Sequence, residues 1–498
     1  MRDKKIICFL LGQAALVMTL AFAIPIIYSL LNNRFEFARF FFLHANIAAM
    51  VSATFFALGR NHRRRIEVID SATAMISVWF VMIIVGAVPF VTAQLLDPVD
   101  AILETAADLT SAGVDFLSSD VDFEFKLWQA TMMWQGSLMF VVVLVTLLPE
   151  VSGCFGMELS LSQGQIFSPM LGQMLNSARR NAGIYSFITL ISILMFMVAG
   201  LDCWNAIVMA MRCISTGGGE FIGADNLYVE YAAAFSMLIA CGNFLLYFRL
   251  SYTLAPHHNT SPKEFKRNLI ANLKTFYSNS EVKFLTVLIL LSTLFVFATI
   301  FSKNYIADGN VSFRMAFFHV VSFVSTTGMT LRDMSSIPDF DRFMLFLLVA
   351  IGGCMGSATG GLKVIRLLVL FKIAAVEIHK TLHPSMMPSI KVNGTAVPMR
   401  VVGRILSYFF LCAVTLFACS VVLSLSGQPF STSVVMTLAC LTNVGTMPGL
   451  CDADTFMQLP ALLKLFCSLI LVVGRMEIFA FLIVISSINI RHEKSHWR

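Results

Sequence analysis

The sequence predicts an all-α polytopic membrane protein. Hydrophobic residues make up 57% of the 498-residue chain and charged residues only 13%, against about 25% charged residues in soluble domains. Apolar runs of roughly 20 residues recur from end to end, and each is long enough to cross the hydrocarbon core as a helix. Because the runs are continuous and do not alternate, they favour helices over a membrane β-barrel. A soluble or an intrinsically disordered protein is excluded.

About ten candidate spans follow one another along the chain. The first begins after a basic N-terminus and is too long for a typical signal peptide, so we expect it to remain uncleaved. The spans cover about residues 6–31, 37–59, 71–95, 128–148, 182–200, 230–254, 282–302, 341–370, 398–425 and 457–488. Eleven scattered cysteines without a Cys-x-x-Cys pair indicate neither a disulfide scaffold nor a zinc site.

Four apolar segments between the later spans are too short to cross a membrane. They cover 99–110, 203–215, 312–325 and 430–441, and each leads into a small cluster rich in Gly, Ser and Thr. Any one of them could be an ordinary apolar loop, but four in phase indicate an internal repeat. We therefore predict two additional N-terminal helices in 1–65 and four re-entrant repeats in 66–180, 181–280, 281–396 and 397–498.

Charge predicts the orientation of these repeats. Lys and Arg concentrate in cytoplasmic loops, and an inside N-terminus leaves the inner segments basic and the outer segments acidic. All four short segments then enter the membrane from outside. Non-helical backbone at membrane depth must be buried in protein or line a water-filled path, so we expect the four turns to converge on one pore.

The turns have the residue types of a cation filter. Gly, Ser and Thr allow backbone carbonyls to replace the hydration shell of a cation, and each short helix would direct its partly negative C-terminal end toward the pore. The candidate filter residues are Thr110, Ser111, Ala112 and Gly113 in the first turn, Ser215, Thr216 and Gly217 in the second, Thr326, Thr327 and Gly328 in the third, and Asn443, Val444 and Gly445 in the fourth.

A glycine-rich segment, GGCMGSATGGLKVIR at 352–366, lies within the eighth span and would break or loosen a helix there. A mobile gate below the filter and a small-xxx-small helix-packing face are both compatible with it. A phosphate-binding loop is not supported, because the lysine and hydroxyl positions of that motif do not match. The candidate gate residues are Gly352, Gly353, Gly356, Gly360 and Gly361, together with Arg475.

Arg475 lies deep in the last span, too far from the inner end for its side chain to reach water. A buried arginine usually faces protein or water and marks an ion path, although a salt bridge to another span is also open. Lys464 lies about three turns earlier on the same helix face. Glu477 is two residues away and points elsewhere.

Together these motifs resemble the TrkH/KtrB potassium-uptake family over essentially the whole chain, and the two additional N-terminal helices resemble its TrkH branch. The motifs are the four glycine-bearing turns, GGCMGSATGGLKVIR, Asn443-Val444-Gly445 followed by Pro448-Gly449-Leu450, and Gly474-Arg475-Met476-Glu477-Ile478-Phe479. The resemblance implies a filter that binds K⁺ as the transported substrate, with Gly113, Gly217, Gly328 and Gly445 at matching positions. It also implies an intramembrane gate at 352–361 and a pore arginine at Arg475.

The same resemblance implies a homodimer with one pore per chain in the lipid of the bacterial cytoplasmic (inner) membrane, with both termini cytoplasmic. It also implies regulation by a cytosolic nucleotide-binding subunit of TrkA type. The Gly-x-Gly-x-x-Gly fingerprint of such a subunit is not found in this chain. We expect no enzyme activity, no cofactor in this chain and no nucleic-acid partner.

The departures from the family pattern are Gly219 where an aromatic residue is expected, Met329 in the third turn, Met355 in the gate, and Thr446-Met447 before Pro448. The departures in the turns, at Gly219, Met329 and Thr446-Met447, weaken the expectation of selectivity for potassium over sodium, and no effect is assigned to Met355.

Two other classes of protein compete with this interpretation. A secondary transporter with discontinuous helices usually shows two inverted halves, whereas this chain shows four units that enter from one side. A membrane-embedded enzyme needs a clustered catalytic set. His44 and His319 are isolated in apolar segments and are more typical of packed histidines.

Overall fold

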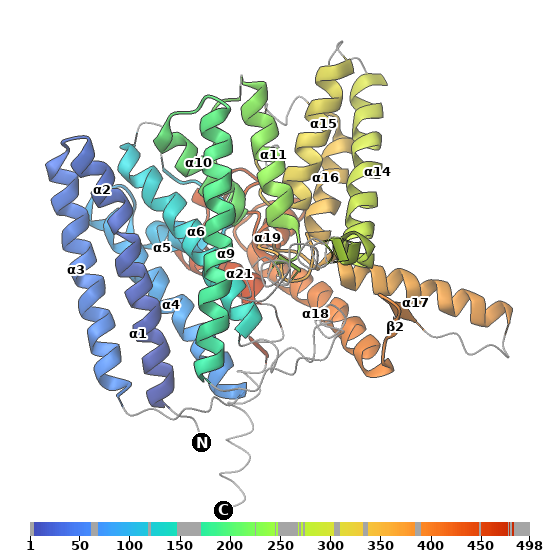
Figure 1. Cartoon of the computed structure of the whole chain (residues 1–498), viewed down its shortest axis with the longest axis horizontal. Coiled ribbons are helices and arrows are strands. Elements are labelled where there is room, and N and C mark those ends of the chain that lie inside the picture. Colours follow the sequence, from blue (N-terminus) through green and yellow to red (C-terminus); the bar gives the residue numbers. More distant parts are fainter. Residues whose placement is uncertain are drawn as a thin grey trace, which may run out of the picture.

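The computed structural model describes residues 4–60, 68–117, 121–146, 171–224, 226–244, 246–247, 267, 270–271, 274–302, 309–331, 337–383, 390–447, 450–476, 478 and 481–482. These residues form a bundle of helices of unequal length, with long helices around short ones (Figure 1). A two-stranded hairpin, β1 (Lys391–Val392) and β2 (Thr395–Ala396), is the sheet found in this part of the chain.

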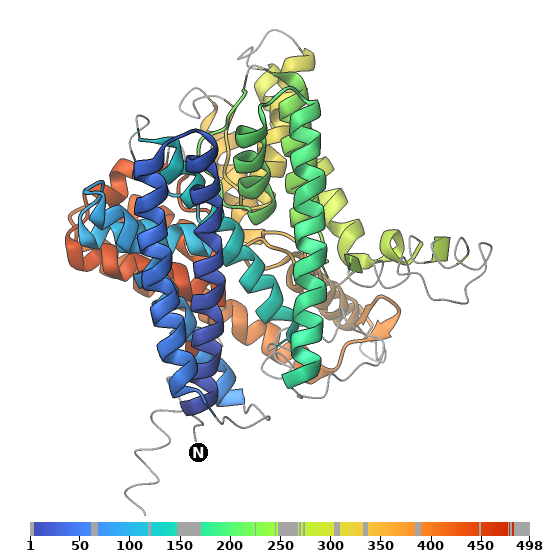
Figure 2. The ribbon, with the colours of Figure 1, turned by 60° about the vertical axis from the view of Figure 1, so that its left-hand side comes forward.

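An N-terminal pair of helices lies at one edge of the bundle, in blue in Figures 1 and 2. It consists of α1 (Lys4–Ala21), which α2 (Ala23–Leu31) continues after a break at Phe22, and α3 (Phe35–Leu58). Proline at position 25 fits the first turn of α2, where its missing N–H is not needed. The pair packs on α4 and α6 of the first repeat.

Each repeat contains a short helix that directly follows a long one. The helices are α4 (Val68–Thr92), α5 (Pro98–Thr110) and α6 (Phe123–Thr146); α9 (Leu171–Val198), α10 (Cys203–Ser215) and α11 (Leu227–Cys241); α14 (Ser280–Ser302), α15 (Gly309–Val324), α16 (Asp339–Ile351) and α17 (Val364–Leu382); and α18 (Met399–Ser424), α19 (Phe430–Thr442), α20 (Ala453–Met457) and α21 (Ala461–Met476). The four short helices α5, α10, α15 and α19 correspond to the four predicted short segments.

Six helices in the described part of the chain are long and apolar enough to cross a membrane, judged by length and composition. They lie at 4–31, 35–58, 73–92, 178–198, 280–302 and 399–424. The other four predicted spans correspond to α6, α11, α16 and α21, and the last three are only 15, 13 and 16 residues long.

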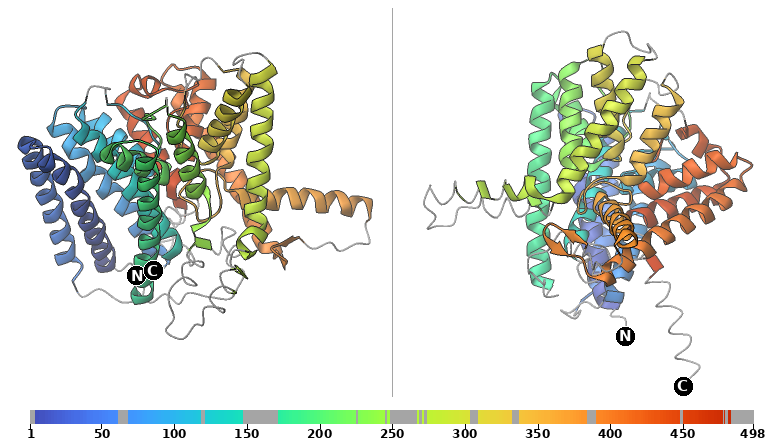
Figure 3. Two further views of the ribbon diagram at one scale, coloured as in Figure 1. Left: turned by 45° about the horizontal axis from the view of Figure 1, so that its top comes forward. Right: turned by 90° about the vertical axis from the view of Figure 1, so that its right-hand side faces the viewer.

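Two predicted spans end earlier than expected. The span placed at 230–254 stops as a helix at Cys241, because Gly242 is extended and the hydroxyl of Tyr247 donates to the carbonyl of Ile239 at 3.1 Å. The span placed at 341–370 is interrupted between α16 and α17, where Gly352 has a φ of +71°. Beyond this interruption α17 projects sideways from the bundle (Figure 1; Figure 3, left).

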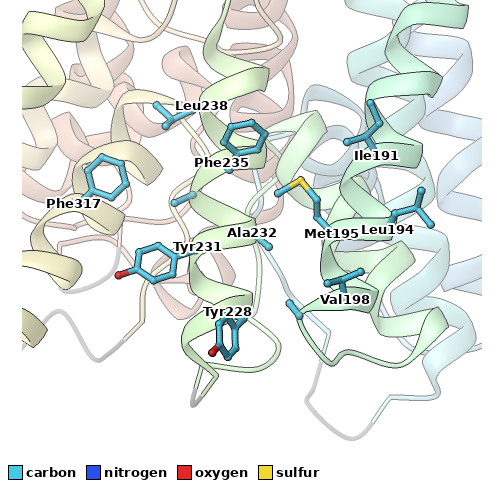
Figure 4. A pocket seen from close by; sticks show the side chains of 12 residues that line it. Ile191, Leu194, Met195, Val198, Tyr228, Tyr231, Ala232, Phe235, Leu238 and Phe317 are labelled. Carbon is cyan, nitrogen blue, oxygen red and sulfur yellow. The ribbon is translucent and has the colours of Figure 1, made fainter.

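An apolar pocket of about 720 Å³ opens between α9, α11 and α15 (Figure 4). Its lining is aliphatic and aromatic, and the hydroxyls of Tyr228 and Tyr231 are the polar side-chain groups that border it. It contains no charged side chain. An ion path therefore has to be sought where the short helices end.

Candidate functional site

The four short helices end in turns with the same backbone. Ser111, Thr216, Thr326 and Asn443 follow α5, α10, α15 and α19 with φ values of 58°, 58°, 57° and 54°. Two residues later stand Gly113, Gly218, Gly328 and Gly445, with φ values of 64°, 66°, 74° and 73°. A left-handed residue ends each helix, and glycine adopts the second left-handed position without steric cost.

This geometry corrects the alignment of the second turn. Sequence spacing matched Gly217 with the key glycines of the other turns, but the matching residue is Gly218. Gly217 instead occupies the position of Ala112, Thr327 and Val444. Three glycines follow Thr216, so the sequence alone does not show which of them matches Gly113, Gly328 and Gly445. The match is fixed by Thr216, the left-handed residue at the end of α10.

The first three turns contact one another through their backbones. A Cβ atom added at Gly113 would lie 2.2 Å from the carbonyl oxygen of Gly217, and one added at Gly218 would lie 2.4 Å from that of Thr327. Neither position has room for any side chain. The first turn therefore abuts the second, and the second abuts the third.

The remaining two contacts close a ring. A Cβ atom at Gly328 would lie 3.0 Å from Cγ1 of Val444, and one at Gly445 would lie 1.9 Å from the carbonyl oxygen of Ala112. The third turn thus meets the fourth, and the fourth returns to the first. The structure brings all four predicted turns together, in chain order, with the C-terminal ends of four helices at the ring.

Every candidate filter residue with a side chain is buried in this ring. The exposed fraction is 4% or less for Thr110, Ser111, Ala112, Ser215, Thr216, Thr326, Thr327, Asn443 and Val444. Backbone carbonyls at the end of a helix carry a partial negative charge. The ring thus combines close carbonyl groups with four helix dipoles of the sign that favours a cation.

In two repeats, a buried side chain of the short helix forms a hydrogen bond with the backbone segment that follows the turn. In the first repeat, Oε2 of Glu104 accepts a hydrogen bond from the backbone N–H of Phe116 at 3.1 Å. In the third repeat, Nε2 of His319 accepts from the N–H of Leu331 at 3.3 Å. Glu104 and His319 both lie seven residues before the left-handed residue, so they are equivalent positions.

A second pair of equivalent positions lies four residues before the left-handed residue. Nη1 of Arg212 donates to the carbonyl of Glu220 at 3.1 Å, and Oγ of Ser322 donates to the carbonyl of Met329 at 2.7 Å. The guanidinium of Arg212 also fills the space beside Gly219, where a Cβ atom would lie 3.2 Å from Cζ of Arg212. This contact accounts for glycine at a position where the family resemblance implies an aromatic residue.

Sequence reasoning did not identify these fastening residues, although their spacing from the turn is a usable signal. It described His319 as a packed histidine, and the structure adds its hydrogen bond to Leu331. His44 is also packed, with Nδ1 2.7 Å from the carbonyl oxygen of Phe40 and Nε2 2.9 Å from Oγ1 of Thr92.

The glycine-rich segment at 352–363 lies directly against the ring. Oγ1 of Thr216 donates to the carbonyl of Ala358 at 3.3 Å, and the N–H of Gly360 donates to Oγ1 of Thr326 at 2.9 Å. A Cβ atom at Gly360 would lie 1.8 Å from the carbonyl oxygen of Thr442. The segment therefore contacts three of the four turns.

The same segment is not helical, so the small-xxx-small helix-packing interpretation is wrong. Gly352, Gly356 and Gly361 have φ values of 71°, 80° and 76°, which glycine tolerates and other residues rarely adopt. A Cβ atom at Gly352 would lie 2.3 Å from the carbonyl oxygen of Gly360. Gly353 is similarly enclosed, with Sγ of Cys241 2.7 Å from an added Cβ.

Arg475 points at this segment. Its side chain is 1% exposed, its Nη1 donates to the carbonyl of Ala358 at 2.8 Å, and its guanidinium lies 4.4 Å from the ring centroid of Phe140. Among the described residues Arg475 has no salt bridge. Glu477, Phe479, Pro448 and Gly449 lie outside the described residues.

The second cation of the last span has a different environment. Nζ of Lys464 pairs with Oδ1 of Asp100 at 2.6 Å, so it links α21 to the first turn of α5. Lys464 and Arg475 therefore share a helix but contact different elements. The first joins the fourth repeat to the first, and the second contacts the glycine-rich segment.

A family model described as a cation transport protein, TrkH, matches residues 38–495. The chain belongs to the TrkH family. Its relatives include the Trk system potassium uptake protein TrkH of Halomonas elongata, 26% identical over 96% of this chain and 98% of the relative. Another is the Trk system potassium uptake protein TrkG of Escherichia coli K12, 29% identical over 84% of each chain.

The crystal structure of the potassium transporter TrkH from Vibrio parahaemolyticus has the same fold. It superimposes with a TM-score of 0.84 and covers 97% of this chain and 98% of that one, at 23% sequence identity. The prediction of a polytopic helical membrane transporter in the TrkH family is thereby confirmed. The ring and the glycine-rich segment thus belong to a cation-transport fold of the TrkH family.

Proposed function

We propose that the protein takes up potassium by passing the ion through the ring of four turns. The observation that carries this proposal is the closure of the ring, in which each turn of the single chain contacts the next. Three of the contacts are to backbone carbonyls, and the contact from Gly328 is to the side chain of Val444. Such a ring presents carbonyl oxygens at the ends of four helix dipoles, which suits a partly dehydrated cation. Relatives named for potassium uptake support the choice of ion.

Segment 352–363, called the gate segment below, lies against the ring and forms the proposed gate together with Arg475. The carbonyl of Ala358 contacts both Thr216 and Arg475, so the gate links a filter turn to the pore arginine. At an effective dielectric near 20, a fixed positive charge about 5 Å from a passing cation costs roughly 3 kcal/mol, or about a hundredfold in occupancy. Arg475 therefore opposes cation passage in the conformation described.

Our proposal extends to the assembly. The protein acts as the membrane subunit of a Trk-type system in the bacterial inner membrane, as a homodimer with cytoplasmic termini, and a TrkA-type nucleotide-binding subunit regulates it. Names that assign the relatives to a Trk system support a multi-component arrangement. The proposed activity is transport of the potassium ion without chemical conversion.

Rubidium uptake into potassium-starved cells that lack other uptake systems tests this function. We expect uptake above that of cells with an empty vector, competition by potassium more than by sodium, and higher basal uptake by Arg475→Ala. Gly445→Ala, which would place a Cβ atom 1.9 Å from a carbonyl oxygen of the ring, is the matched loss-of-filter control. Full membrane expression without rubidium uptake in the wild type and Arg475→Ala would overturn the proposal.

A further inference from the structure

The gate segment is anchored to the end of α11 by its main chain. The N–H of Cys354 donates to the carbonyl of Cys241 at 3.0 Å, and the N–H of Ala358 donates to that of Ala240 at 3.3 Å. In return the carbonyl of Gly356 accepts from the N–H of Phe244 at 3.3 Å. The segment is thus a folded structure with specific partners, and moving it requires that these bonds break.

A buried carboxylate completes this anchorage. Glu281 is fully buried in the first turn of α14, and its Oε1 accepts the N–H of Met355 at the apex of the gate segment. Its Oε2 accepts from Nδ2 of Asn243 at 3.2 Å. Hydrogen bonds to a charged acceptor are stronger than those to a neutral one. Glu281 is therefore the acceptor that ties Met355 to the start of α14.

A second charged residue fastens the far end of the gate segment. Lys363 is buried there. Its Nζ donates to the carbonyl of Thr359 and lies 3.2 Å from Oγ1 of the same residue. Glu281 and Lys363 thus stabilise the two ends of one compact turn.

The hairpin β1–β2 connects to the same place by two routes. Oδ1 of Asn393, in the hairpin turn, accepts the N–H of Ser280 at 2.8 Å, directly before Glu281. Val392 of β1 is fully buried in an apolar cluster that also contains Met355. The hairpin lies near the start of α14 in Figure 1. A displacement of the hairpin would therefore disturb both the donor and the acceptor of the Met355 bond.

We propose that Glu281 is a positioning residue that holds the gate segment closed, and that the β1–β2 hairpin is mechanically coupled to this latch. The inference rests on the proposed function, because it assigns a role in cation flux to residues that do not touch the ion. Opening then requires Met355 to leave the carboxylate of Glu281, either through movement of the start of α14 or through movement of the hairpin.

Rubidium flux into proteoliposomes of the purified full-length protein tests the latch. Replacing the charged acceptor by an amide in Glu281→Gln weakens the bond to Met355 while keeping the side-chain shape, so we expect basal flux to rise roughly tenfold. Asn393→Ala should raise it about twofold to fivefold, because it removes one indirect contact. Glu36→Gln, at an exposed position in the first turn of α3, is the matched control and should leave flux unchanged.

A second background separates gating from simple loss of structure. In a variant lacking residues 356–358 the latch has no gate to hold, so Glu281→Gln should add nothing to its raised flux. Hydrogen exchange of the peptide around Met355 should accelerate in Glu281→Gln and stay unchanged in Glu36→Gln. Equal changes from Glu281→Gln in both backgrounds would show a purely structural role and overturn the latch.

The outcomes also separate this inference from the proposed function. If the deletion variant conducts rubidium and Glu281→Gln behaves like the wild type, the latch is wrong and the pore stands. If no variant conducts rubidium, the deletion included, potassium transport itself fails.

Discussion

The third and fourth turns of the ring have the same backbone but are held in different ways. In the third, Ser322 and His319 bind the chain after the turn with their side chains. The equivalent positions of the fourth repeat are the buried, apolar Ala439 and Met436. There the chain after the turn instead pairs with itself, through two 2.8 Å backbone hydrogen bonds between Met447 and Cys451.

This difference shows that one backbone conformation can be stabilised by side chains of its own short helix or by backbone pairing and a contact with another helix of the same repeat. The fourth turn depends on contacts with other elements, since Nδ2 of Asn443 donates to the carbonyl of Leu471 in α21 at 2.9 Å. The backbone pairing of Met447 with Cys451 also explains why Thr446-Met447 stands before Pro448, a departure from the family pattern. The additional length before Pro448 supplies Met447, one partner of the short backbone pairing that takes the place of a side-chain fastening.

The largest expected effect on stability and selectivity comes from replacing the left-handed glycines of the third and fourth turns, Gly328 and Gly445, by alanine. Gly445→Ala would place Cβ 1.9 Å from the backbone oxygen of Ala112, whereas Gly328→Ala would place it 3.0 Å from the Val444 side chain. Both pay about 1–2 kcal/mol for the left-handed conformation, but only the first also collides with backbone. We expect Gly445→Ala to prevent folding or abolish potassium selectivity, and Gly328→Ala to reduce stability moderately.

Thermal unfolding and the potassium-to-rubidium and potassium-to-sodium flux ratios of the two purified variants check this order. Equal stability of the two variants would contradict the ring geometry.

The next effect concerns the side-chain fastening of the third turn. His319→Ala removes the acceptor of the Leu331 N–H and leaves a buried cavity, so we expect a loss of about 2–4 kcal/mol. Met436→Ala, the equivalent position in the fourth repeat, creates a cavity without breaking a hydrogen bond. Flux ratios should change in His319→Ala and remain near wild type in Met436→Ala; the reverse pattern would refute the comparison.

A smaller effect is expected where the fourth turn contacts α21. Asn443→Gly retains the left-handed φ of +54° but loses the hydrogen bond to Leu471, which should cost about 1 kcal/mol. Thr326→Gly, at the equivalent position of the third turn, loses its bond to Gly360 of the proposed gate. Thermal unfolding should therefore show similar losses for both variants, whereas only Thr326→Gly should raise basal rubidium flux.

The smallest effect tests the closure between the fourth and first repeats. Lys464 and Asp100 form a partly exposed ion pair, with side chains 12% and 19% exposed. A double-mutant cycle with Lys464→Met and Asp100→Asn should give a coupling energy of about 1 kcal/mol or less, and it should fall in high salt. A coupling energy that is insensitive to salt would show that the pair is held by burial instead.

Much of the architecture could be predicted from the sequence, because hydrophobic length and glycine clusters report directly on membrane geometry. The four short helices and the interruption near Gly352 follow from the local composition. The helix end at Cys241 could not be predicted, because it depends on the packing of Tyr247 against Gly242.

The candidate site was predictable at the level of its turns and less so at the level of their support. Convergence of four separate turns followed from the fact that lipid cannot satisfy bare backbone. The one-residue shift at Gly218 required backbone angles, since three successive glycines look alike in sequence. Glu281 lies 74 residues from its partner Met355, and no local pattern connects them.

The closure of the ring by one chain has a consequence for how such a pore diverges. A pore built from four identical subunits carries the same residue at every symmetric position, so any substitution is imposed four times at once. In each turn one position lies between the left-handed residue that ends the helix and the left-handed glycine that follows. It is occupied by four different residues, Ala112, Gly217, Thr327 and Val444. Each side of the passage can therefore change by a single mutation while the other three sides keep the architecture intact.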